Sequence, residues 1–233
     1  MPVDTRMLHH CLPLQWILVP ENAFAPHNIK TAMIQKLSDV RPMEVVSIYS
    51  RTLNSWFGFS SAVRLCSELQ TTWDDCQVDS TLLVSTILLF NTNPQSIEGI
   101  YSLHPDTMTL YLSCRSWIAL LEGTGLNSIN LVYSRLLMTL FEVVHGLYPA
   151  AYLSIAATVR AADALSVFDG NGVPLSLPLG PIGLKEEEEY REMWCGIFVL
   201  DRFVTKIYYL LEPSDRARLL KPYSLTDLPL SGL

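Results

Sequence analysis

The segment from Ser128 to Val144 constrains the fold most strongly, because polar residues occupy only a narrow stripe of it. Arg135, Thr139 and Glu142 recur at i, i+4 and i+7, and nearly every other residue of the stretch is apolar. A helix that is apolar on most sides is stable only when other elements bury it. We therefore expect a central buried helix here, with Ser128 as its N-cap, since a serine hydroxyl can accept a hydrogen bond from a free N–H of the first turn.

Helical spacing of apolar residues recurs on both sides of this segment. It predicts further helices over residues 43–57, 60–70, 79–90, 106–123, 150–168 and 186–211. Residues 169–184 contain four Gly and three Pro, so we expect a loop there. No stretch alternates convincingly like a strand. We predict an all-α fold, an irregular multi-helix bundle.

Prolines also set the expected domain limits. Five of them lie between positions 2 and 42 with little apolar periodicity, which predicts an irregular N-terminal arm over residues 1–41. The chain has 233 residues, a length that suits a single domain. We expect one helical domain over residues 42–233.

The composition indicates either a large core or apolar surface left for a partner. Hydrophobic residues make up 49% of the chain and charged residues 17%, where about 25% charged is usual. Such a chain is too apolar for large-scale disorder. Its apolar runs are nevertheless shorter than the roughly 20 residues that a membrane-spanning helix needs. We expect an intracellular protein without membrane contact.

Charge and cysteine usage exclude two further classes of site. The net charge is −7 and the Lys and Arg residues are scattered, whereas DNA binding needs them clustered. We therefore expect no direct DNA binding by this chain. The five cysteines (Cys11, Cys66, Cys76, Cys114 and Cys195) contain no CxxC pair. We expect buried free thiols, no metal site and no cofactor.

One motif carries a family resemblance. The string EYREMWCGIFVLDR, residues 189–202, resembles the most recognisable motif of the fungal-specific transcription factor regulatory domain, the middle homology region of zinc-cluster transcription factors. Residues 110–165 are similar to the central helices of that family, and Trp56–Ser60 resembles its Trp-aromatic turn. The resemblance covers roughly residues 43–229. The matching positions of the motif are Arg191, Trp194, Leu200, Asp201 and Arg202.

The sequence also departs from that family. The six closely spaced cysteines of the DNA-binding zinc cluster are lacking, Cys195 stands where a second Trp is common, and we expect a domain that is short at its C-terminus. The resemblance implies a transcription regulator of a fungal secondary-metabolite gene cluster, located in the nucleus, or otherwise in the cytoplasm. Its helical domain would bind a small-molecule effector, a protein partner or a second copy. Another subunit would then contact DNA.

Two alternatives stay open at this stage. A biosynthetic enzyme of cyclase or isomerase type could hold an apolar substrate in a helical cavity, with Asp201, Arg160 or His145 as polar contacts. The chain could also be the product of a decayed gene without function. No known catalytic motif is present, and we assign no catalytic residue.

Candidate binding residues follow from the pattern of aromatic and polar side chains. Asp201 falls on the predicted apolar face of its helix, where a buried carboxylate needs a partner. We expect an ion pair between Asp201 and Arg160, with Arg115 or Arg135 as second choices. His145 is expected to cap a helix end. The candidate ligand-binding residues are Trp117, His145, Tyr152, Arg160 and Trp194.

Overall fold

The structure is a computed structural model that describes residues 25–53, 65, 67, 69, 72–92, 96–97, 100–101, 103–165 and 181–210. Most of the expected helix over 60–70, the first part of the expected loop over 169–184, and the tail after residue 210 lie outside the described residues.

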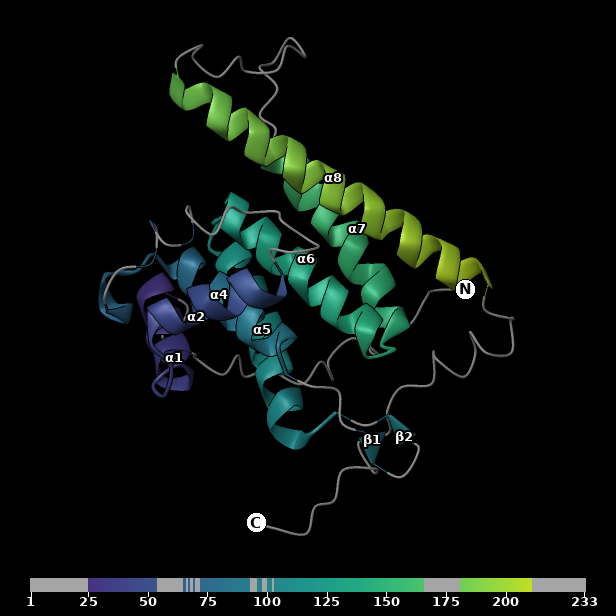
Figure 1. Cartoon of the computed structure of the whole chain (residues 1–233), viewed down its shortest axis with the longest axis horizontal. Helices are drawn as coiled ribbons and strands as arrows, with labels where there is room; N and C mark the ends of the chain where they lie inside the picture. Colours follow the sequence, from purple (N-terminus) through teal and green to yellow (C-terminus); the bar gives the residue numbers. More distant parts are fainter. Residues whose placement is uncertain are drawn as a thin grey trace, which may run out of the picture.

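The described chain is helical, apart from one very short hairpin. The strands β1 (Ser96–Ile97) and β2 (Ile100–Tyr101) pair antiparallel over two residues each. This architecture confirms the predicted all-α fold (Figure 1). The helices are α1 (Pro26–Lys36), α2 (Pro42–Thr52), the 3-10 turn η3 (Trp73–Asp75), α4 (Val78–Phe90), α5 (Pro105–Gly123), α6 (Ile129–Val144), α7 (Tyr148–Leu165) and α8 (Pro181–Leu210).

Helix α6 is the centre of the molecule, as its sequence predicts. It contacts α4, α5, α7 and α8 (Figure 1), and every residue from Asn130 to Val143 except Arg135 is buried. One side of α6 packs with α2, α7 and α8, and the other side packs with α1 and α5. The helix therefore divides the apolar core into two clusters.

The start of α6 is fixed by the predicted cap. The Ser128 hydroxyl accepts a hydrogen bond from the Leu131 N–H at 3.2 Å and donates one to Asp79 Oδ2 at 2.7 Å. Asp79 lies in the first turn of α4. One serine thus caps α6 and ties its first turn to α4.

Helix α1 corrects the expectation of an irregular arm over residues 1–41. Pro26 occupies the first turn, where its missing N–H would be unpaired in any case. Ile29, Met33 and the C-cap Leu37 follow at intervals of four and are buried. Ile29 and Met33 belong to the core cluster with α4 and α5, and Leu37 belongs to the cluster with α2 and α4. The proline that looked like a helix breaker in the sequence is a helix start.

Helix α8 covers only one side of the bundle. Its 30 residues run across the outside of α7 (Figure 1), and it begins at Pro181, inside the segment expected to be a loop. Met193, Ile197, Leu200 and Val204 form its buried stripe. From Glu188 onward, the opposite face of α8 is exposed.

Candidate functional site

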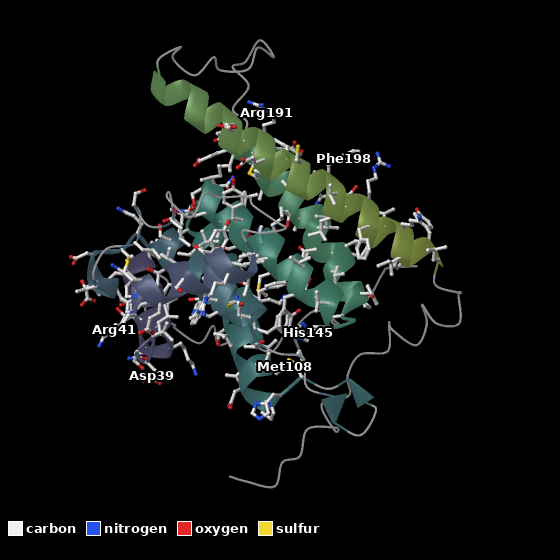
Figure 2. The ribbon with its side chains drawn as sticks, in the orientation of Figure 1. Asp39, Arg41, Met108, His145, Arg191 and Phe198 are labelled. Carbon is white, nitrogen blue, oxygen red and sulfur yellow. The ribbon has the colours of Figure 1, made fainter. Side chains whose placement is uncertain are left out.

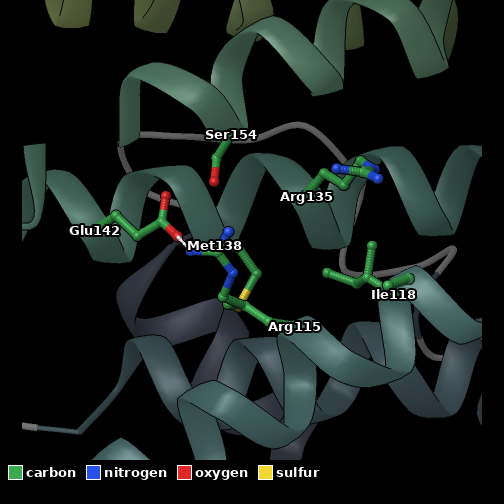
Figure 3. A pocket seen from close by; sticks show the side chains of 7 residues that line it. Arg115, Ile118, Arg135, Met138, Glu142 and Ser154 are labelled. Atoms are coloured by element: carbon green, nitrogen blue, oxygen red, sulfur yellow. Dashed lines mark hydrogen bonds and ion pairs between the residues drawn. The ribbon is translucent and has the colours of Figure 1, made fainter. Parts of the chain in front are cut away.

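A polar pocket lies between α5, α6 and α7 (Figure 3). Its volume is about 200 Å³, enough for a small molecule but below the usual range for drug-sized ligands. Charged and hydroxyl groups come from all three helices, and apolar side chains complete the wall. The lining residues are Arg115, Ile118, Ala119, Arg135, Met138, Glu142 and Ser154.

Glu142 is the central group of this pocket. Its side chain is fully buried. Its Oε1 accepts hydrogen bonds from the Tyr111 hydroxyl at 2.7 Å and from Arg115 at 3.1 Å. Its Oε2 makes no hydrogen bond of regular geometry with a described residue, but the Ser154 hydroxyl also interacts with this carboxyl.

Burial controls the protonation of Glu142. Loss of solvation raises the pKa of its carboxyl above the ordinary value, although the Ser154 and Tyr111 hydroxyls and the Arg115 guanidinium act in the opposite direction. Burial and the nearby Glu142 charge likewise raise the pKa of Tyr111 far above its usual range. The Tyr111 hydroxyl is therefore a proton-bearing donor to Glu142 throughout the physiological range.

A second ion pair borders the pocket. Arg135 donates from Nε and from one terminal nitrogen to the two carboxylate oxygens of Glu122, across α5 and α6. This two-bond geometry fixes the plane of the guanidinium. Two arginines thus line the pocket, and each is paired with a carboxylate: Arg115 with Glu142, and Arg135 with Glu122 (Figure 3).

The structure does not bring the predicted ligand-binding residues together at this pocket. Trp117 is buried in the core on α5, and Trp194 is half-buried on α8. Tyr152 stacks on Tyr208 with ring centroids 4.6 Å apart, and Arg160 is exposed on α7. None of them lines the pocket.

His145 is the C-cap of α6, as expected. Its Nδ1 lies 2.9 Å from the Phe141 carbonyl oxygen, and because that oxygen can only accept, Nδ1 carries the proton. Its Nε2 is buried without a partner among the described residues. The histidine therefore ends the helix instead of lining the pocket.

The expected ion pair between Asp201 and Arg160 is not found in the part of the chain that the structure describes. Arg160 is exposed and Asp201 is half-buried. The buried stripe of α8 consists of Met193, Ile197, Leu200 and Val204. Asp201 lies at the edge of that stripe and keeps access to solvent. The second-choice partners are occupied elsewhere, since Arg115 pairs with Glu142 and Arg135 pairs with Glu122.

Sequence reasoning placed Glu142 and Arg135 on the polar stripe of the buried helix, but it did not identify them as a site. The signal that could have found the site was the Glu142 carboxylate within an otherwise apolar helix. A buried carboxylate must be paired or neutral, so its presence there predicts a partner nearby. Tyr111 and Arg115 come from another helix, and their approach depends on tertiary packing.

The exposed side of α8 is a second candidate site, which we call the outer face. It carries five of the exposed large apolar side chains of the described residues: Phe198, Val199, Phe203, Tyr209 and Leu210. Phe198 and Val199 are each 60% exposed. Arg191 and Phe198 project away from the bundle (Figure 2). The outer face consists of Glu188, Arg191, Glu192, Cys195, Phe198, Val199, Arg202, Phe203, Lys206, Tyr209 and Leu210.

Metal and membrane sites are not found in the described part of the chain. No three His, Cys, Asp or Glu side chains there lie close enough to hold a metal ion. None of the described helices combines the length and the hydropathy of a membrane span. Cys76 and Cys114 are buried free thiols, as expected, but Cys195 is exposed; Cys11 and Cys66 lie outside the described residues.

The chain is similar to a fungal transcription factor. The relative is "Transcription factor BOA15" of Botryotinia fuckeliana (strain B05.10), which is 27% identical over 119 residues. The match covers 51% of this chain and 63% of the relative, less than two thirds of that protein's length. No family model and no solved structure matches the chain.

Proposed function

We propose that this chain is a regulator of transcription that acts through contacts of its helical body, while another polypeptide supplies the contact with DNA. The similarity to a protein named a transcription factor supports the regulatory role. The net charge of −7 and the lack of a six-cysteine cluster in this sequence favour a separate DNA-binding subunit. The resemblance of residues 43–229 to the fungal-specific transcription factor regulatory domain supports a location in the nucleus and control of a fungal secondary-metabolite gene cluster.

The observation that carries the proposal is the outer face of α8. A solvent-facing helix surface is normally polar, and a row of exposed aromatic and aliphatic side chains marks an interaction site. This row extends from Cys195 to Leu210, about 22 Å along the helix axis. Phe198 and Arg202 also form a cation–π contact, with the guanidinium 5.1 Å from the ring centroid.

The charges on the outer face favour a second copy of this chain as the partner. Glu188 and Glu192 lie in its first half, offset in part by Arg191, whereas Arg202 and Lys206 lie in its second half. Two copies packed antiparallel with a two-fold axis beside position 197 bring Glu188 level with Lys206 and Glu192 level with Arg202. Opposite charges then face each other twice, by symmetry, around an apolar centre.

Charge-reversal variants test this dimer. Glu188→Lys with Glu192→Lys makes the outer face wholly basic, and Arg202→Glu with Lys206→Glu leaves Arg191 as its single cation. Each pair of substitutions should weaken self-association about tenfold or more, since four attractive contacts become repulsive. Combining all four substitutions should restore the dimer, because the charges are then exchanged between the two halves.

Sedimentation equilibrium of the full chain measures these association constants. Arg160→Glu, an exposed reversal on α7 away from the outer face, is the matched control and should leave the dimer unchanged. Equal self-association of wild type and both double variants contradicts the second-copy partner, as does failure of the fourfold variant to recover.

A biosynthetic enzyme is the second candidate function, and Glu142 favours it. A buried carboxyl whose pKa is raised can donate a proton to a bound substrate as a general acid. Deleting the gene separates the two functions. Loss of transcripts from a set of genes supports the regulator, whereas unchanged transcripts with accumulation of one intermediate support the enzyme.

A further inference from the structure

We infer that the pocket between α5, α6 and α7 binds a small apolar monocarboxylate, and that one edge of the Arg115 guanidinium captures its carboxylate. The carbon body of the ligand lies on Ile118, Ala119 and Met138, which line the same pocket. The inference concerns a ligand that the proposed function does not assign, and it does not depend on the outer face of α8.

The hydrogen bonds of Arg115 leave one edge of its guanidinium free. Its Nη1 alone donates to the Tyr111 hydroxyl at 2.8 Å and to Glu142 Oε1 at 3.1 Å. Nε and Nη2 form the opposite edge of this planar group, and neither donates to a residue that the structure describes. Two parallel N–H groups on one edge of an arginine are the donors that a carboxylate accepts in a bidentate pair.

Arg115 is both accessible and held in place. Its side chain is 43% exposed and lines the pocket (Figure 3). The two hydrogen bonds of Nη1 fix one end of the guanidinium, and a cation–π contact places its carbon 5.7 Å from the centroid of the Tyr111 ring. A side chain that is already ordered loses little conformational freedom on binding, which favours affinity.

Arg135, the second arginine of the pocket, does not offer the same edge. Its Nε and Nη2 already donate to the two carboxylate oxygens of Glu122. This ion pair balances the charge of Arg135 within the protein. The arrangement therefore favours a ligand with a single carboxylate at Arg115 over one with two.

Glu142 does not contact the ligand, but it sets the charge beside it. Its carboxyl is fully buried and has Tyr111, Arg115 and Ser154 as partners. Burial raises the pKa of this carboxyl, which makes its neutral form easier to reach than that of an ordinary glutamic acid. When Glu142 holds a proton, Arg115 keeps a positive charge that one carboxylate of a ligand neutralises.

The shape of the pocket limits the size of the ligand. At about 30 Å³ for each water in the liquid, a volume of about 200 Å³ corresponds to roughly six or seven waters. A ligand of about six to ten non-hydrogen atoms fills it. Ile118, Ala119 and Met138 present only carbon and sulfur atoms, so the body of that ligand is apolar.

Three compounds test the inference: benzoate, benzamide, which has nearly the same shape without the negative charge, and acetate, which lacks the apolar body. Binding to the full chain is measured by ligand-observed NMR titration. We expect saturable binding of benzoate in the millimolar range. Benzamide should bind about tenfold more weakly, the loss expected for charge-assisted hydrogen bonds, and acetate should also bind at least about tenfold more weakly because it buries less apolar surface.

Variants locate the binding. Arg115→Lys keeps the positive charge but lacks the two parallel donors, and it should weaken benzoate binding about tenfold. Ala119→Phe places a large side chain in the pocket and should abolish binding. Ala164→Phe, the matched control at an exposed alanine of α7 outside the pocket, should leave the affinity unchanged.

Any of four results overturns the inference: no saturable binding of benzoate, equal binding of benzamide or acetate, equal binding of benzoate to Arg115→Lys and wild type, or equal binding to Ala119→Phe and wild type. None of these results bears on self-association through α8 or on transcript levels. Failure of this inference is therefore distinguishable from failure of the proposed function.

Discussion

At the scale of single residues, Glu142 shows how burial and pairing compete. Its carboxyl is fully buried, one oxygen accepts hydrogen bonds from Tyr111 and Arg115, and the Ser154 hydroxyl is a further partner. Arg115 and the two hydroxyls favour its charged form, yet the loss of solvation is larger and raises its pKa. The ion pair with Arg115, whose own side chain is 43% exposed, therefore does not offset the desolvation of Glu142.

The raised pKa of Glu142 predicts a pH-dependent stability. The native chain binds this proton more readily than the unfolded chain. Its contribution is therefore complete below the ordinary Glu pKa, and it is lost as the pH rises through the raised pKa. Urea unfolding from about pH 4 to about pH 8 measures this. The free energy of unfolding of wild type, relative to Glu142→Gln, should fall as the pH rises.

Arg115 and Tyr111 both face this carboxyl, and neither loses its proton over that range, since the pKa of each is raised. The change in stability is therefore assigned to Glu142 itself. A difference between wild type and Glu142→Gln that stays constant, or that grows with pH, contradicts the direction of the shift.

Cysteine labelling gives a second prediction at this scale. Burial raises the pKa of the Cys114 thiol to about 12, whereas Cys195 is exposed on the outer face. Iodoacetamide followed by mass spectrometry of each peptide should modify Cys195 rapidly in the native protein and leave Cys114 unmodified. Because the proposed dimer covers Cys195, its rate should fall as the protein concentration rises. A rate independent of concentration argues against an interface at this position.

Residue contacts were the least predictable part of the site. The stripe of Arg135 and Glu142 is visible in the sequence because both interrupt an apolar helix. Their partners are not, because the hydrogen bond from Tyr111 joins residues 31 positions apart on separate helices. The expected ion pair of Asp201 with Arg160 is not found for a related reason, since the approach of two side chains from separate helices depends on tertiary packing: Asp201 is half-buried at the edge of the α8 stripe, and Arg160 is exposed on α7.

At the scale of elements, α6 is the central helix of the core and contacts α4, α5, α7 and α8. Phe141 is fully buried and stacks on Tyr111 with ring centroids 5.5 Å apart. Phe141→Ala should lower the free energy of unfolding by about 3–5 kcal/mol. Val144→Ala, at an exposed position of the same helix, should change it by less than about 0.5 kcal/mol. Denaturant unfolding checks both, and similar losses at the two positions contradict a central α6.

The elements were predictable where apolar periodicity and caps agree. Helix α6 begins after Ser128 and ends at Val144, as expected. Helices α1 and α8 both begin at a proline, Pro26 and Pro181, that the sequence reading treated as part of an irregular segment. A proline restricts the residue before it and suits the first turn after it, so its sequence position alone does not distinguish an interruption from a start.

At the scale of the whole molecule, the surplus of apolar residues has two destinations. Part of it forms the two core clusters on either side of α6. The rest lies on the outer face of α8. This agrees with the composition, which indicated either a large core or apolar surface for a partner. The pocket and the outer face lie on opposite sides of α7, which contacts both α6 and α8. This helix therefore links the two candidate sites.

Transcript levels in a strain that carries the α8 variants test the central claim most directly. Arg202→Glu with Lys206→Glu should lower the transcripts of the regulated genes to the level of a gene deletion, with the protein still present and folded. The fourfold charge exchange should restore those transcripts. Wild-type transcript levels in the double variant would contradict the claim that this chain regulates transcription through the outer face of α8.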